Sequence, residues 1–303
     1  MQKITDKGYA KVIIVNWNGK RFLDDCLSAL GEQTYPNLEV ILVDNGSTDG
    51  SVDFVHDHFP RVHIMSLNEN VGFAKANNSA MIKALNDGAQ HIALLNNDTK
   101  VDEKWLEHLV AVMESEKDIG ICASKMMRMD NPRILDSAGH MFKWGRIFER
   151  GHGEVDARQY DDRLDIIGAC AGACLYRKEM LEDIGLFDER FGSYYEDAEL
   201  SWRAHNRGWR ARFVPESIVL HYRGGTTKSD RKLEREMKIR YAMTVVETVK
   251  KHASPGQKLT VSLSCLILMP YREVQKRLDR SDIGGGLYWE QLKRLWSPQS
   301  PAI

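Results

Sequence analysis

Strong net charge and paired cysteines are both missing from this sequence. The 42 basic and 43 acidic residues leave a formal net charge of -1, so no general attraction to nucleic acid is expected and any anionic ligand must be bound locally. The cysteines form an odd set without paired zinc-ligand spacing: Cys26, Cys122, Cys170, Cys174 and Cys265. We expect Cys170 and Cys174 to pack as small apolar side chains and assign them no chemistry.

Several familiar signatures are missing as well. No Gly-x-Gly-x-x-Gly motif follows the first predicted strand and no Walker A sequence occurs, which argues against dehydrogenases and P-loop proteins. The N-terminus shows no signal-peptide pattern, so we expect a cytoplasmic protein. The apolar segment from Leu259 to Met269 is too short to span a bilayer.

The first hundred residues alternate between strand and helix patterns. Apolar runs that are typical of buried strands occur at residues 10–15, 38–43, 62–65 and 91–95, and helical patterns lie between them. This alternation predicts an α/β fold with a mostly parallel central sheet that is flanked by helices. In such folds ligands bind outside the carboxyl ends of the strands.

The rest of the chain is less regular at first and then helical. Residues 125–165 show no clear period, whereas residues 166–221 include a predicted helix from about Glu196 and a strand at 217–220. We place a main domain at residues 9–225 and a C-terminal helical extension at 226–303. In that extension, basic residues and tryptophans follow an apolar segment, which favours either contact with a membrane surface or packing on the domain or on a second subunit of a homodimer.

Two carboxylates follow predicted strands and point to a ligand site. Asp44 closes the second strand, and Asp98 follows Asn96 and Asn97 directly after the strand that ends at Leu95. Carboxylate and amide oxygens suit Mg²⁺ or Mn²⁺, which also prefer substrate phosphate oxygens to thiolates. The alternative for each segment is a polar loop that caps the following helix.

Three further segments carry candidate functional residues. Asn70, Gly72 and Lys75 lie where a nucleotide could rest against a helix, although Asn70 could equally cap that helix. Glu196 and Asp197 are predicted at a helix N-terminus, where the helix dipole favours their charged forms, and Asp197 is our preferred general base. Strand-end His221 precedes a Gly-Gly loop whose basic residues, Arg223 and Lys228, are suited to a lid over a diphosphate.

Taken together, these segments resemble the family 2 glycosyltransferases, particularly bacterial rhamnosyltransferase-like members that act in cell-surface polysaccharide assembly. The similarity covers roughly residues 10–225 and rests on the order and spacing of its motifs. They are Val15-Asn16-Trp17-Asn18-Gly19, Val43-Asp44-Asn45-Gly46-Ser47-Thr48-Asp49, Asn68-Glu69-Asn70-Val71-Gly72-Phe73, Leu94-Leu95-Asn96-Asn97-Asp98, Phe187-Asp188-Glu189-Arg190-Phe191 and Glu196-Asp197.

The resemblance implies a GT-A nucleotide-diphospho-sugar transferase fold and a role for each motif. It implies that Asn16, Asn18, Asp44 and Ser47 hold the nucleotide, that Asn97 contacts the donor, and that Asp98 and His221 bind a metal bridging the two phosphates. It further implies that Asp197, next to Glu196, deprotonates an acceptor hydroxyl, so that the sugar is transferred with inversion. Gly172, Ala173 and Tyr195 would lie on the acceptor side. The usual Asp-x-Asp metal motif is here Asn96-Asn97-Asp98, with one carboxylate.

The resemblance leaves the substrates open. Rhamnose from a thymidine diphosphate donor and a glycan or lipid-linked acceptor at the inner face of the plasma membrane are the expected pair. Two other classes of protein remain as alternatives at this stage. One is a metal-dependent nucleotidyltransferase, and the other is a non-catalytic binding or scaffold protein on a degenerate transferase fold.

Overall fold

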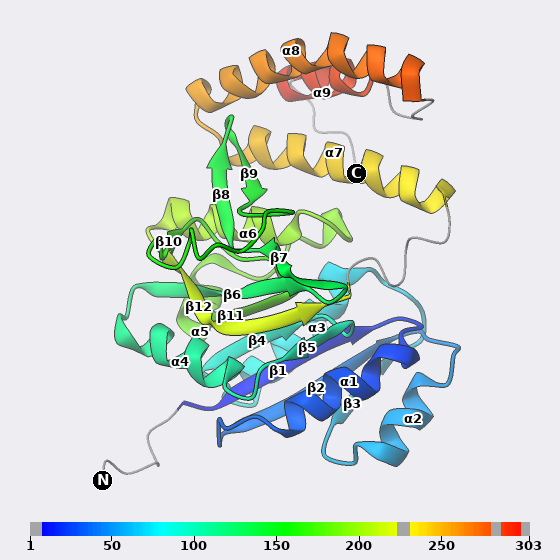
Figure 1. The fold of residues 1–303 in the computed structure, drawn as a ribbon, viewed down its shortest axis with the longest axis vertical. Helices are drawn as coiled ribbons and strands as arrows, with labels where there is room; N and C mark the ends of the chain where they lie inside the picture. Colours follow the sequence, from blue (N-terminus) through cyan, green and yellow to red (C-terminus); the bar gives the residue numbers. More distant parts are fainter. Residues whose placement is uncertain (1–7, 223–230, 280–285, 298–303) are drawn as a thin grey trace.

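The computed structural model describes residues 8–222, 231–279 and 286–297. Arg223 and Lys228, the predicted lid residues, lie outside these ranges, and so does the predicted boundary between residues 225 and 226. Figure 1 shows the sheet in the lower part of the molecule, with the C-terminal helices stacked above it.

A ten-stranded sheet forms the centre of the molecule, with β10-β12-β6-β11-β4-β1-β2-β3 as its main path. Most strands of this path run in one direction: β3 (His63–Leu67), β2 (Leu38–Asn45), β1 (Ala10–Asn16), β4 (His91–Leu95), β6 (Ile119–Arg128) and β12 (Arg210–His221). The antiparallel strands are β11 (Ala173–Arg177), which lies between β4 and β6, and β10 (Asp165–Ile166) at the edge. Short β5 (Thr99–Val101) pairs with β12, and β7 (Asn131–Ser137) pairs with β6. The predicted α/β class and mostly parallel sheet are confirmed.

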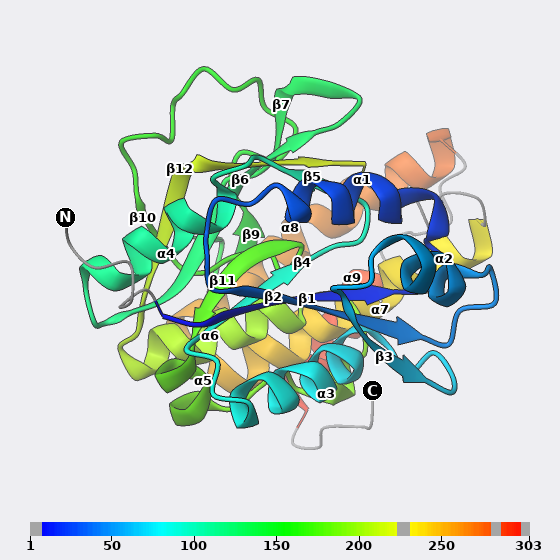
Figure 2. The same cartoon turned by 90° about the horizontal axis from the view of Figure 1, so that it is seen from below.

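Helices cover both faces of this sheet (Figure 2). Helices α1 (Lys20–Gly31) and α4 (Trp105–Ser115) bury Leu23, Leu27 and Trp105 on one face, beside α2 (Ser51–His58). On the other face lie α3 (Phe73–Asn86), α5 (Lys178–Ile184) and α6 (Glu196–Arg207), which bury Met81, Met180 and Leu200. The strands are apolar on both faces because both faces are covered, which is why they appear in the sequence as continuous apolar runs.

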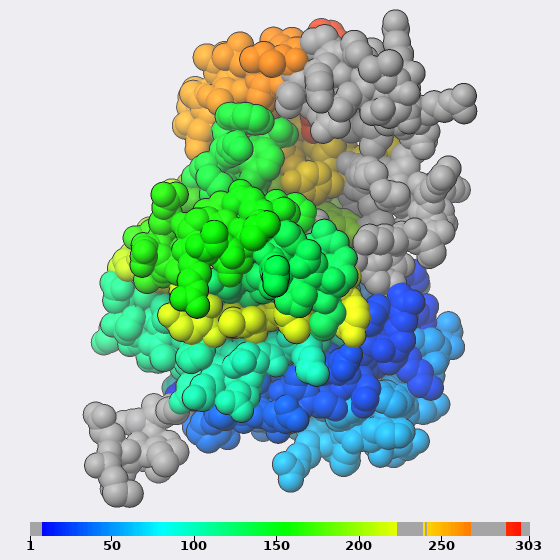
Figure 3. All heavy atoms as spheres, viewed as in Figure 1, coloured from blue at the N-terminus to red at the C-terminus, as the bar shows by residue number. Residues whose placement is uncertain are grey.

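A third apolar core joins the C-terminal helices to α6. The hairpin of β8 (His140–Lys143) and β9 (Arg146–Glu149) lies between α6 and the helices α7 (Arg231–His252), α8 (Pro255–Asp279) and α9 (Gly286–Trp296). This core contains Ile147, Tyr195, Trp202, Val246 and Val261. In Figure 3 the hairpin rises to α8, and a Cβ on Gly145 at its tip would lie 2.5 Å from the Gln257 carbonyl oxygen. The C-terminal extension is therefore packed against α6 and the hairpin rather than only tethered to them.

The elements match the sequence patterns closely, with two informative differences. The predicted strand at 217–220 is the end of the longer β12, whose first half is hidden from a pattern analysis by its arginines and by Pro215. Pro255 does end one helix, and it also begins α8, as proline at a first helical position can. None of the described helices is long and apolar enough to cross a membrane.

A buried carboxylate, Glu199, fixes α7 to α6. Its side chain is 0% exposed, and it accepts hydrogen bonds from Arg203 (2.8 Å), Lys251 (2.9 Å) and His252 (2.7 Å). Burial alone would raise the pKa of Glu199, but these cationic partners outweigh it and hold the pKa below its ordinary value. The contact between α6 and α7 thus depends on an ionised carboxylate.

Replacing Glu199 with glutamine is expected to lower the free energy of unfolding by about 3 kcal/mol at pH 7, because Arg203, Lys251 and His252 lose the buried charge that they bind. Since the folded pKa is depressed, the stabilisation is present above the ordinary glutamate pKa of about 4.3 and is lost as the pH falls through the folded value. Urea unfolding at pH 7 and at pH 4 measures both effects. The matched control is Glu182→Gln, which removes an exposed ion pair with Lys178 and is expected to change stability by less than about 1 kcal/mol. A Glu199 effect as small as the control would contradict this account.

Candidate active site

The predicted site residues converge where the parallel strands end. The register pairs Asn16, the last residue of β1, with Asp44 of β2. The turn after β4 carries Asn96, Asn97 and Asp98, and β12 ends at His221. These side chains occupy one edge of the sheet because parallel neighbours end on the same side.

Buried amides connect the ends of β1, β2 and β4. The Asn16 side-chain amide donates to the Ser47 hydroxyl at 3.2 Å and lies 3.4 Å from an Asp44 oxygen. Its own oxygen accepts a 2.7 Å hydrogen bond from Asn97. The other Asp44 oxygen accepts the Ser47 backbone N–H at 3.1 Å. These bonds fix the rim formed by the ends of β1, β2 and β4 in one arrangement.

The turn after β1 fits closely against that rim. Asn18 has a φ of 51°, and its side-chain oxygen accepts the Thr48 backbone N–H at 2.8 Å. The next residue, Gly19, has no room for a side chain, because a Cβ there would lie 2.1 Å from the Asn97 amide nitrogen. The turn can therefore approach the β4 end only with glycine at position 19.

Asn70, Gly72 and Lys75 have different surroundings. The Asn70 oxygen accepts 3.0 Å bonds from Asn45 and from the Gly72 backbone, so its observed contacts organise the turn. The first N–H groups of α3 are bound by the segment before α6: Ala74 donates to the Gly192 carbonyl at 2.8 Å. Lys75 is exposed on α3. Contact between these residues and a nucleotide remains a prediction.

His221 lies between two carboxylates. Its Nε2 is 3.2 Å from Asp98 Oδ1, and its Nδ1 is 2.6 Å from Asp136 Oδ2. Burial alone would lower the pKa of His221, but hydrogen bonds to Asp136 and Asp98 raise it to about 9. The Asn96 amide nitrogen is 3.5 Å from His221 Nε2. Asn96 stands where the usual Asp-x-Asp motif has its first aspartate, so this altered position adjoins the same histidine. Sequence analysis missed Asp136, which lies on β7 in the stretch without a clear period.

Glu196 and Asp197 open α6, as predicted. Asp197 accepts backbone N–H groups from Ala171 (3.0 Å) and Ala198 (2.7 Å). Burial raises the pKa of Asp197 and, together with the Asp197 charge, raises that of Glu196 well above its usual range. The expectation that the helix dipole favours both charged forms is therefore wrong, because desolvation outweighs it. One buried Glu196 oxygen, Oε2, has no hydrogen-bond partner among the described residues.

The predicted acceptor-side residues are closely packed. The Gly172 carbonyl accepts the Asn96 backbone N–H at 2.9 Å, and Ala173 begins β11 with 1% of its surface exposed. The Tyr195 hydroxyl is bound at 3.0 Å to both the N–H and the carbonyl of Ile147. These contacts bring α6, β9 and the end of β4 together. A role in acceptor binding remains a prediction for all three residues.

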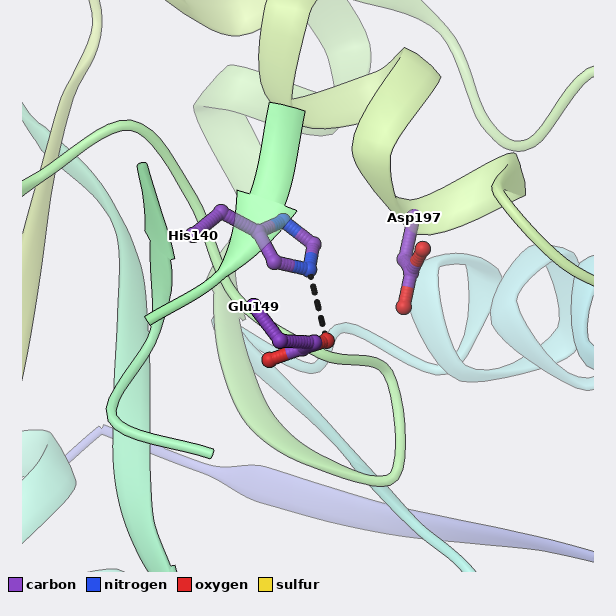
Figure 4. A group of neighbouring side chains, drawn as sticks. All are labelled: His140, Glu149 and Asp197. Carbon is purple, nitrogen blue, oxygen red and sulfur yellow. Dashed lines mark hydrogen bonds and ion pairs between the residues drawn. The ribbon is translucent and has the colours of Figure 1, made fainter. Parts of the chain in front are cut away.

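A cluster that sequence analysis missed lies beside Asp197. Its members are His140 of β8, Glu149 of β9 and Asp197, whose side-chain ligand atoms all lie within 4.8 Å of one another (Figure 4). His140 Nε2 is 3.1 Å from Glu149 Oε1, and the Ser137 hydroxyl donates to the other Glu149 oxygen. The two strands come from residues 125–165, where no periodic pattern marked them.

The arrangement provides the parts of a group-transfer site. The rim of amides and a carboxylate lies at the ends of β1 and β2. Next to it are a carboxylate and an imidazole, Asp98 and His221, and across β11 is a second carboxylate, Asp197, of raised pKa. A partly buried base near the ends of parallel strands can take a proton from a substrate hydroxyl.

Comparison with known proteins finds a matching family model, similar sequences and a similar structure. The family model described as "Glycosyl transferase family 2" matches residues 11–185. The N-acetylglucosaminyl-diphospho-decaprenol L-rhamnosyltransferase of Mycobacterium tuberculosis is 26% identical over 72% of this chain and 78% of its own length. The dTDP-rhamnosyl transferase RfbF of Shigella flexneri is 24% identical over 69% of this chain and 67% of its own length. The structure of the mannosyltransferase PcManGT from Pyrobaculum calidifontis, in complex with GDP-Man and Mn²⁺, has a TM-score of 0.60 at 17% identity. The match covers 98% of this chain and 90% of the PcManGT chain.

Proposed function

The chain belongs to glycosyl transferase family 2 and has the GT-A fold, and on this premise we propose that it is an inverting, metal-dependent rhamnosyltransferase of cell-surface polysaccharide synthesis. The observation that carries the proposal is the convergence of Asp44, Asp98, His221 and Asp197 on one edge of the sheet, within the fold that the relatives share. The proposed donor is a thymidine diphosphate sugar, and the proposed acceptor is a hydroxyl of a lipid-linked glycan. The names of the two bacterial relatives support this pair of substrates.

The donor is proposed to bind with its nucleotide at the ends of β1 and β2. Asp44 and the amides of Asn16 and Asn18 offer hydrogen-bond partners for a base and a ribose, and their mutual bonds hold them in place before binding. Asn97 connects this rim to Asp98. A diphosphate extending from the rim would therefore reach the cation site directly.

A divalent cation is proposed at Asp98 and His221. Their facing atoms are 3.2 Å apart, which is close to the separation of adjacent ligands around an octahedral ion with bonds of about 2.1 Å. Asp136 accepts from the opposite nitrogen of His221, an arrangement that orients metal-bound histidines in many proteins. Bound Mg²⁺ or Mn²⁺ would stabilise the charge that develops on the departing diphosphate. The Mn²⁺ in the similar archaeal structure supports the assignment.

Asp197 is proposed to act as the general base. Its carboxylate is held by the N–H groups of Ala171 and Ala198, so it is directed at the start of β11 rather than at solvent. A raised pKa makes an ionised Asp197 a stronger base, because it lies closer to the working pH. Proton removal from the acceptor hydroxyl allows direct attack on the anomeric carbon from the face opposite the leaving diphosphate, with inversion.

The C-terminal helices are proposed to meet the membrane that carries the acceptor. Leu259, Leu263 and Ile267 recur on α8 and are 54%, 51% and 72% exposed. Trp289 and Trp296 of α9 are also exposed. An apolar helical stripe with nearby tryptophans suits the interface of a bilayer. We propose residues 9–225 as the catalytic domain and 226–303 as this extension.

Release of nucleoside diphosphate tests the proposed function. The purified protein is incubated with a panel of nucleotide-sugars, with and without Mg²⁺ or Mn²⁺, and the released diphosphate is measured. Metal-dependent release from a thymidine diphosphate sugar is expected, because slow hydrolysis of the donor needs no acceptor. Neither release nor binding of any donor would contradict the proposal and favour a non-catalytic binding protein. Release of pyrophosphate from a nucleoside triphosphate would instead identify a nucleotidyltransferase.

A further inference from the structure

The base candidate Asp197 has two charged neighbours that no part of the proposed mechanism uses. His140 is 2% exposed, and its Nε2 faces Glu149 at 3.1 Å while its Nδ1 lies 3.4 Å from the Ser201 hydroxyl. Figure 4 shows the imidazole and the Glu149 carboxylate on one side and Asp197 on the other. The side-chain ligand atoms of all three residues lie within 4.8 Å of one another.

The contacts of this cluster favour a proton on its histidine. Burial alone would lower the pKa of His140, but the charge and hydrogen bond of Glu149, followed by the charge of Asp197, raise it above its ordinary value. Conversely, burial would raise the pKa of Glu149, and His140 and Ser137 hold it below its ordinary value. Both shifts favour an imidazolium and a carboxylate, which face each other at His140 Nε2 and Glu149 Oε1.

The shifts of the other ionisable groups near Asp197 favour their neutral forms. Burial raises the pKa of each of them: Tyr195 before α6, Glu196 of α6, Cys170 before β11, Cys174 and Tyr176 of β11, and Tyr241 of α7. Arg146, also on β9, lies near Tyr195 and Tyr241. In the described part of the chain, the charges that act on the pKa of Asp197 are those of His140 and Glu149.

We propose that His140 and Glu149 form an ion pair that positions the base electrostatically: His140 keeps Asp197 ionised, and Glu149 keeps His140 protonated. The imidazole is buried, whereas 32% of the Glu149 side chain is exposed. An opposite charge within about 4–6 Å favours the ionised form of a carboxylate. Without His140, Asp197 would face burial and the Glu149 charge together, and the base would be protonated at the pH where it must accept a proton. The inference rests on the proposed role of Asp197.

The first test uses the protein without substrate. The titration of His140 is followed by NMR of ¹³C-labelled histidine, with His140→Gln assigning its signal. Coupling between two sites is reciprocal, so Asp197→Asn is expected to lower the His140 pKa by about one unit or more, and Glu149→Gln is expected to lower it further. A His140 pKa that is the same in Asp197→Asn and in the wild type would overturn the proposal. Because this readout needs no turnover, it decides the inference even if no donor proves to be a substrate.

The second test is the pH dependence of kcat for transfer or donor hydrolysis. In His140→Gln the amide can still donate to Glu149, but the positive charge is gone. The acid limb of the profile, which reports the base in the bound complex, is expected to move up by about 1–3 pH units. Glu149→Gln removes a like charge from the surroundings of Asp197 but also lowers the pKa of His140. These two effects oppose each other, so its acid limb should move up less than that of His140→Gln. A lower kcat with an unmoved acid limb in His140→Gln would show a structural role alone and would overturn the proposal.

A histidine on the same helix provides the matched control. His205 is exposed on α6 with its ring against Phe142, and His205→Gln is expected to leave both the profile and the His140 titration unchanged. Thermal unfolding of each variant shows whether the buried substitution is tolerated. If His140→Gln does not fold, the His140 titration in Asp197→Asn still decides the question, with the signal assigned by elimination from variants of the other histidines.

Discussion

Asp197→Asn is expected to lower kcat by about 10²–10⁴-fold, the usual contribution of a general base, while donor binding stays within about twofold of the wild type. The asparagine oxygen can still accept the Ala171 backbone N–H that Asp197 accepts at 3.0 Å, so the segment before β11 should keep its place. The variant loses the ability to take a proton and also the second oxygen, which accepts the Ala198 N–H at 2.7 Å. Steady-state kinetics and calorimetric titration with the nucleoside diphosphate measure the two quantities.

Asp162→Asn is the matched control, because Asp162 is an exposed aspartate in the loop before β10. It should retain full activity. A loss of donor affinity in Asp197→Asn that equals its loss of kcat would mean that Asp197 binds the donor rather than acting as the base. Retention of full kcat would exclude it from proton transfer altogether.

Asp98→Asn is expected to lower metal-dependent release of nucleoside diphosphate by about 10²–10³-fold and to weaken Mn²⁺ binding at least tenfold. The substitution removes the one carboxylate of the Asn96-Asn97-Asp98 segment, and the remaining ligand candidate, His221, is a single nitrogen. Electron paramagnetic resonance of free Mn²⁺ measures the affinity, and diphosphate release measures the rate. An unchanged Mn²⁺ affinity in this variant would place the cation elsewhere.

Binding of Mn²⁺ should also depend on pH, because the ion must replace the proton on His221. The pKa of His221 is about 9 in the structure without an ion, so affinity should rise about tenfold per pH unit below that value. Asp57→Ala, which removes an exposed carboxylate beside His56 on α2, should change neither the affinity nor its pH dependence. An affinity that is independent of pH between 6 and 8 would exclude His221 as a ligand.

The sequence predicted the first strands of the sheet well, for a physical reason. These strands are covered on both faces and the motifs follow their ends, so apolar runs located the strands and polar interruptions marked candidate site residues. Asp44, Asp98 and His221 were singled out in this way, and their roles remain predictions. The family and the fold class predicted from these motifs are confirmed.

The neighbours of these residues could not be predicted, because they come from segments with no periodic pattern. Asp136, His140 and Glu149 lie on short strands of four to seven residues, and each contacts its partner only through the tertiary fold. The raised pKa values of Glu196 and Asp197 could not be predicted for a related reason. The sequence shows that they begin a helix, but it does not show how far the tertiary fold removes their carboxylates from water.

Helix α6 separates two apolar cores and packs against both of them. Leu200 and Ala204 pack toward the sheet, whereas Ala198 and Trp202 pack toward the hairpin and the C-terminal helices. A chain shortened after Tyr222 would lose α7–α9, exposing Trp202, which is 1% exposed in the intact protein, and leaving Glu199 without Lys251 and His252. The helix that carries the proposed base would lose the packing on one of its faces. The extension therefore supports the candidate active site, and its removal is expected to lower activity even if residues 9–222 remain folded.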